Sequence, residues 1–157
     1  MHTLKPLLFA LITAVAMPVF AADAPADNME ILREKIKADK KLVVAANLGL
    51  TEAEAKKFWP VYEAYQTELQ SINERLGNVI ASYAKDYRAD TLDDAKAKKL
   101  IDESLAVEAA ETQLRKDFVP KLSEALPAKK VARYLQIENK IRAIGKYELA
   151  EAVPLVE

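Results

Sequence analysis

The sequence predicts an all-α protein in which four helices form a long, bent helical hairpin. Three observations predict this fold class. The 157 residues include only three glycines, which is few for a protein built on many tight turns. Apolar residues recur in alternating steps of four and three from Phe58 to Tyr83, the heptad spacing of a helix that packs along its whole length. Capping residues and prolines divide the rest of the chain into further helical stretches.

Residues 1–21 have the pattern of a secretory signal peptide. A weakly basic start is followed by an uncharged stretch from Pro6 to Ala22, and Asp23 comes directly after it. We expect cleavage after Ala21. The apolar run is shorter than the ~20 residues of a spanning helix, so we expect no stable membrane insertion after cleavage. The mature chain is expected in the periplasm, with a flexible lead-in over residues 22–28.

Removal of the signal would leave little catalytic chemistry. The single histidine is His2, within the signal, and the sequence has no cysteine. Thiol catalysis, disulfides and thiolate metal sites are excluded, and the usual general base at neutral pH is absent. We therefore expect no enzyme activity, no cofactor and no metal site. The net charge of −1 gives no strong field that would attract nucleic acid.

The first two helices are predicted from their ends. A helix over residues 29–48 is expected to end at Gly49. Thr51 and Glu54 have the spacing of a capping box and start the second helix, which extends to about Tyr87. The apolar positions along the second helix predict its buried stripe: Phe58, Tyr62, Tyr65, Leu69, Ile72, Leu76, Val79 and Tyr83.

The third helix is expected to start at Thr91. Asp93 and Asp94 would then lie in its first turn, where carboxylates complement the helix dipole. Its apolar stripe is expected to contain Leu100, Val107, Leu114 and Phe118, widened by Ile101 and Leu105. Pro60 and Pro120 lie inside the second and third helices and should bend them.

The fourth helix is expected to open at Pro127, a favoured first-turn residue, and to fray from Gly145 to Glu151. A single helical domain would then cover residues 29–150. The apolar tail, residues 151–157, is expected to dock on the helices, and an exposed interaction segment is the alternative. Because one helix pair cannot cover every apolar stripe, we also expect a homodimer.

The starts of the second and fourth helices are similar in sequence. Leu50-Thr51-Glu52-Ala53-Glu54 and Leu126-Pro127-Ala128-Lys129-Lys130 both begin with leucine. An aromatic residue follows each at the same offset, Phe58 after the first and Tyr134 after the second.

The first of these segments resembles the LTxxQ motif of the periplasmic Spy/CpxP-like proteins. It departs from that motif in having Glu54 in place of glutamine. The second segment resembles a degenerate copy, with Pro127 for threonine and Lys130 for glutamine. The run Phe58-Trp59-Pro60 that follows the first segment is typical of a divergent branch. The motif residues themselves are interpreted as structural, since Thr51 and Glu54 cap a helix.

The resemblance implies a bent hairpin that dimerises into a cradle. It also implies ATP-independent holding of unfolded or misfolded envelope proteins under stress. A regulatory adaptor that binds an envelope-stress sensor is the alternative, and a non-catalytic structural protein of the periplasm is a third possibility. The residues proposed to contact clients lie near the turn of the hairpin: Tyr87, Arg88, Lys96 and Lys99.

Two other patterns are candidates for catalysis and for metal binding, and the first of them is interpreted as a solvated helix face. Ser82 and Lys85 match the serine–lysine spacing of penicillin-binding enzymes, but the accompanying Ser-Asp-Asn and Lys-Thr-Gly elements are missing. Glu108 and Glu111 lie one turn apart, but a di-iron bundle also needs histidine ligands.

Overall fold

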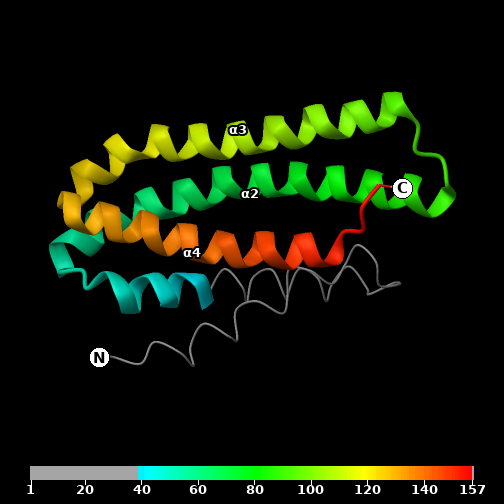
Figure 1. Ribbon diagram of the computed structural model, residues 1–157. Helices are drawn as coiled ribbons and strands as arrows, with labels where there is room; N and C mark the ends of the chain where they lie inside the picture. Colours follow the sequence, from blue (N-terminus) through cyan, green and yellow to red (C-terminus); the bar gives the residue numbers. More distant parts are fainter. Residues whose placement is uncertain (1–38, 157) are drawn as a thin grey trace. The chain divides into compact units, whose positions relative to one another are not determined.

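A computed structural model describes residues 39–156 of the protein (Figure 1). These residues form four helices: residues 39–48, α2 (Glu52–Ala89), α3 (Asp94–Ala125) and α4 (Ala128–Ala152). The predicted all-α class is confirmed for this part of the chain. The predicted signal peptide, the lead-in and the first part of the 29–48 helix lie outside the described residues.

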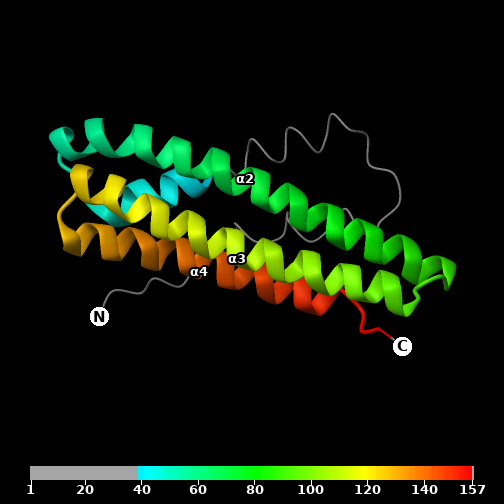
Figure 2. The ribbon, with the colours of Figure 1, turned by 90° about the horizontal axis from the view of Figure 1, so that it is seen from above.

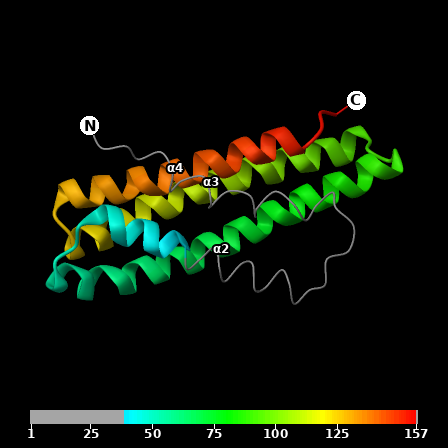
Figure 3. The same cartoon turned by 90° about the horizontal axis from the view of Figure 1, so that it is seen from below.

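The described residues divide into two compact units. One unit comprises residues 50–131 and contains α2, α3 and the first turn of α4. In it, α2 and α3 lie side by side as an antiparallel hairpin, joined by a short turn (Figures 2 and 3). The other unit comprises residues 39–49 with residues 132–155.

The start of α2 is fixed by the capping box that the sequence predicts. The Thr51 backbone amide donates to Glu54 Oε2 at 2.8 Å, and the Glu54 amide donates to Thr51 Oγ1 at 3.2 Å. Each contact supplies an acceptor to a backbone amide that has no carbonyl partner at the start of the helix. The helix continues through Pro60 to Ala89, so the predicted end near Tyr87 is correct to within two residues.

The start of α3 differs from the prediction. Its N-cap is Asp93, whose Oδ1 accepts from the Lys96 amide at 2.8 Å. Thr91 lies before the helix, and its hydroxyl donates to Asp86 Oδ1 at 2.9 Å. Both residue types favour helix starts, but the Thr91 side chain is used to pair with the end of α2, which leaves Asp93 to cap α3.

The core of the hairpin combines buried residues of both long helices. On α2 they are Phe58, Tyr62, Tyr65, Tyr83 and Ala84, and on α3 they are Val107, Glu111, Leu114, Phe118, Leu122 and Ala125. The predicted aromatic positions are therefore buried. Ile101 and Leu105 are each 59% exposed, so the prediction that they widen the buried stripe is wrong. At ~100° per residue they lie about 120° and 160° around the helix from Val107.

The start of α4 lies one residue from its predicted position. Pro127 is the residue just before the helix, and its carbonyl accepts from the amides of Lys130 at 2.8 Å and Val131 at 3.1 Å. The predicted opening at Pro127 is thus one residue early, because α4 begins at Ala128.

The end of α4 differs more from the prediction. The helix continues through Gly145 to Ala152, so the predicted fraying from Gly145 is wrong. The Val153 amide still donates to the Leu149 carbonyl at 2.9 Å, which continues the helical pairing beyond the glycine. The tail after Val153 is non-helical, as predicted, but Leu155 is 88% and Val156 61% exposed. These two side chains are therefore not docked.

The unit of residues 39–49 and 132–155 contains several of the most deeply buried side chains. Val44, Leu48 and Tyr134 are almost completely buried. Lys40 Nζ and Glu138 Oε2 form an ion pair at 2.9 Å, with both side chains largely buried. Gly49 follows the first helix with φ of +58°, the left-handed conformation in which glycine commonly ends helices.

Candidate functional site

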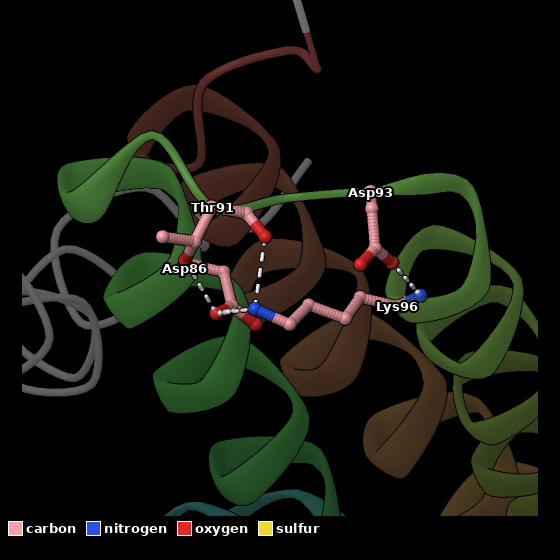
Figure 4. Close-up of polar contacts among 4 residues, drawn as sticks. All are labelled: Asp86, Thr91, Asp93 and Lys96. Carbon is pink, nitrogen blue, oxygen red and sulfur yellow. Dashed lines mark hydrogen bonds and ion pairs between the residues drawn. The ribbon is translucent and has the colours of Figure 1, made fainter.

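The turn between α2 and α3 is held by a cluster of polar side chains, which we call the hairpin tip: Asp86, Thr91, Asp93 and Lys96 (Figure 4). Lys96 Nζ lies 2.7 Å from Asp86 Oδ1 and 2.8 Å from the Thr91 carbonyl oxygen. The same Asp86 oxygen accepts from the Thr91 hydroxyl. One carboxylate at the end of α2 therefore receives donors from the turn and from the start of α3.

The hydrogen bonds of the tip also lower the pKa of Asp86. The hydrogen bond from Lys96, followed by that from Thr91, holds the pKa of the Asp86 carboxyl below its ordinary value of 3.8. Asp90, between these groups, has φ of +51° and caps the end of α2. Aspartate is one of the few residue types with a side chain that visits this conformation regularly.

The four residues predicted to contact clients all lie at or near the tip. Tyr87 is half-buried, and its ring lies 5.7 Å from that of Tyr83. Arg88 and Lys99 are exposed. Lys96 is half-buried and holds the turn together. A substitution of Lys96 would thus alter the tip itself, which makes Arg88 and Lys99 the better probes of client contact.

Between the buried rings of Tyr65 and Tyr83, the apolar side chains of the hairpin are only half-buried. We call these five residues the hairpin seam: Leu69, Ile72, Leu76 and Val79 on α2 and Leu100 on α3. Part of this apolar surface is therefore accessible to solvent. Arg75 and Glu103 form an ion pair across the two helices at 3.7 Å, each about half exposed.

At the opposite end lies the hairpin base, where the start of α2 meets the start of α4. Lys130 Nζ donates to Glu54 Oε2 at 2.5 Å. The last positions of the two LTxxQ-like segments thus contact each other. The hydrogen bond from Lys130, with that from the Thr51 amide second, holds the pKa of Glu54 below its ordinary value of 4.5. Sequence reasoning missed this pair, because the two residues are 76 positions apart.

The remaining motif residues are packed around this base. Phe58 and Leu126 are buried, and Trp59 is half-buried with its ring edge-on to those of Phe58 at 5.1 Å and Tyr62 at 5.3 Å. Pro60 lies inside α2 and is exposed. These positions lie around the helix junction of the hairpin base.

The patterns considered for catalysis and metal binding are placed as follows. Ser82 and Lys85 are both exposed on α2. Glu108 is exposed and Glu111 is buried on α3. Within residues 39–156, no three histidine, cysteine, aspartate or glutamate side chains are grouped so that they could hold a metal ion. In the same residues, no helix combines the length and apolar character that crossing a membrane requires.

Compared with models of protein families, with curated proteins and with solved structures, the chain matches none of them.

Proposed function

We propose that the protein is a periplasmic, ATP-independent chaperone-like protein that holds unfolded or misfolded envelope proteins. The observation that carries this proposal is the hairpin seam, a row of half-buried apolar side chains from Leu69 to Val79 beside Leu100. The resemblance of Leu50–Glu54 to the LTxxQ motif and the signal-like residues 1–21 support it. This proposal treats the protein as a divergent relative of the Spy/CpxP-like family.

The proposed mechanism is weak, multivalent binding along the seam. Each contact would remove apolar surface from water at roughly 25 cal/mol per Å². Because each seam residue is already half-buried, each adds only a modest amount, and a client segment could leave and fold without nucleotide hydrolysis. Exposed charges such as Arg75 and Glu103 beside the seam would contact the polar groups of the same segment.

Two lysines at or near the tip are paired with carboxylates. Lys96 pairs with Asp86, and Lys98 pairs with Asp102 at 2.5 Å. The exposed Lys99 lies between these two pairs in sequence. We therefore propose that the tip contributes a narrow cationic contact through Lys99, while the seam supplies most of the affinity.

Homodimerisation is part of the same proposal. Ile101 and Leu105 lie one turn apart on α3 and are largely exposed, and exposed apolar pairs on a thin helical hairpin favour assembly of two copies. Sedimentation equilibrium of the purified protein tests this element separately from client binding.

The chaperone proposal is tested by light scattering. A denatured, unrelated protein is diluted into buffer with and without the purified protein, and no ATP is present. We expect suppression of aggregation near equimolar ratios. Leu76→Gln should reduce it severalfold, whereas Leu42→Gln, the same change at a 67% exposed leucine of the helix over residues 39–48, should not.

Absence of suppression by protein shown to be helical would contradict the proposal. A dedicated adaptor for a stress sensor would then be the better hypothesis. It predicts tight, stoichiometric capture of a single envelope protein in a pull-down.

A further inference from the structure

The Glu54 carboxylate connects two helix starts through one oxygen atom. Glu54 Oε2 accepts from the Thr51 backbone amide at 2.8 Å and from Lys130 Nζ at 2.5 Å. The first contact closes the N-terminal turn of α2, and the second connects that turn to the first turn of α4. Loss of the negative charge on this oxygen would weaken both contacts together, because hydrogen bonds to an ionised acceptor are the stronger kind.

We propose that Glu54 is an acid-sensitive latch at the hairpin base: protonation of its carboxylate releases Lys130 and loosens the first turn of α2. This inference goes beyond the proposed chaperone function and does not depend on it. It concerns a conformational response that would be present whether the seam binds clients or not.

The charged groups around Glu54 determine the pH range in which the latch opens. Lys130 is the charged side chain that faces Glu54 from α4, and it acts both as a donor and through its charge. Glu52, Lys56 and Lys57 on α2 are exposed. Because the folded pKa of Glu54 lies below the ordinary 4.5, the contribution of Glu54 to stability is present at neutral pH. It is lost as the pH falls through the folded pKa.

The protein carries its own reporter for this event. Trp59 is the single tryptophan of the chain and is located in α2 a little more than one turn after Glu54. Its half-buried ring rests edge-on against Phe58 and Tyr62. Loosening of the first turn of α2 would change the packing of these rings and therefore the tryptophan emission.

The test is an acid titration of the full protein from about pH 7 to about pH 2.5, followed by Trp59 fluorescence and by amide hydrogen exchange of residues 52–58. The wild-type protein should show a fluorescence transition with a midpoint below 4.5. At about pH 7, exchange of these amides should be roughly fivefold slower in the wild type than in Glu54→Gln, as expected when an ionised helix cap is compared with a weakened one, and the two proteins should exchange alike at about pH 3.

Glu54→Gln should lack the transition, because its neutral amide does not titrate and pairs only weakly with Lys130 at every pH. Glu52→Gln removes an equal charge from the same turn and should retain it. Lys130→Met should move the midpoint upward, toward the ordinary carboxyl value. If the wild type and Glu54→Gln instead titrate alike by both readouts, the latch does not exist. A general acid unfolding shared by all variants would give that result and would overturn the proposal.

Discussion

The ring of Tyr65 on α2 meets the ring of Phe118 on α3 edge-on, with the centroids 5.3 Å apart and the planes at 74°. Both side chains are nearly fully buried. Edge-to-face geometry places the positive edge of one ring on the negative face of the other. The pair therefore joins the two long helices at one defined register, which in turn positions the hairpin seam.

Removal of either ring should be among the most damaging substitutions in the hairpin. Phe118→Ala is expected to reduce the free energy of unfolding by about 3–5 kcal/mol, since it deletes a buried aromatic side chain and leaves a cavity. Urea denaturation followed by circular dichroism measures the loss. A double-mutant cycle with Tyr65→Ala should give a coupling of about 0.5–1.5 kcal/mol, and additive losses would show that the rings do not interact.

Gly77 offers a stabilising substitution. It lies exposed within α2, and apart from its own stretch of helix backbone no atom lies within 4 Å of the position that a Cβ would occupy. Gly77→Ala should therefore raise the free energy of unfolding by about 1 kcal/mol, the difference in helix propensity. Gly49→Ala is the matched control. It should destabilise the protein, because Gly49 has φ of +58° and alanine is strained there.

The hairpin tip should contribute stability that depends on pH. Lys96 and Thr91 lower the pKa of Asp86 below 3.8, so Asp86 stabilises the fold above that range, and its contribution is lost as the pH falls through the folded pKa. Asp86→Asn is thus expected to lower the melting temperature at pH 7 and to have little effect near pH 2.5. An equal loss at both values would show that charge at Asp86 is not what holds the turn.

Client contact at the tip is predicted for Tyr87, Arg88 and Lys99. Replacement of Tyr87 and Arg88 with alanine should weaken suppression of aggregation while helicity stays unchanged, and Lys99→Ala should do the same to a smaller extent. Far-UV circular dichroism provides the check on folding. Undiminished suppression by all of these variants would remove the tip from the binding surface.

Local signals in the sequence predicted much of this architecture. The Thr51–Glu54 capping box has a fixed spacing of three residues, and the apolar series from Phe58 to Tyr83 repeats without a break, so each was recognisable without tertiary information. The Thr91 start was wrong because a side chain that could cap α3 is instead paired with Asp86. Whether Thr91 caps α3 or pairs with Asp86 depends on the tertiary structure of the turn.

Other features depend on contacts between distant segments. Ile101 and Leu105 are apolar and lie near the predicted stripe, but only the packing of α3 against α2 determines which apolar residues face inward. The Glu54–Lys130 pair joins residues from two helix starts, and the half-burial of the seam follows from how many helices surround it. Neither has a local signature in the sequence.

The central claim is that the hairpin seam binds unfolded segments, and site-specific labelling tests it most directly. The chain has no cysteine, so Leu76→Cys and Leu42→Cys, the second at a 67% exposed position outside the hairpin, each provide one position for an environment-sensitive dye. Addition of an unfolded client should shift the emission of the dye at position 76 to shorter wavelength and leave that at position 42 unchanged. The same change in emission at both labelled positions, or no change at position 76, would contradict binding at the seam.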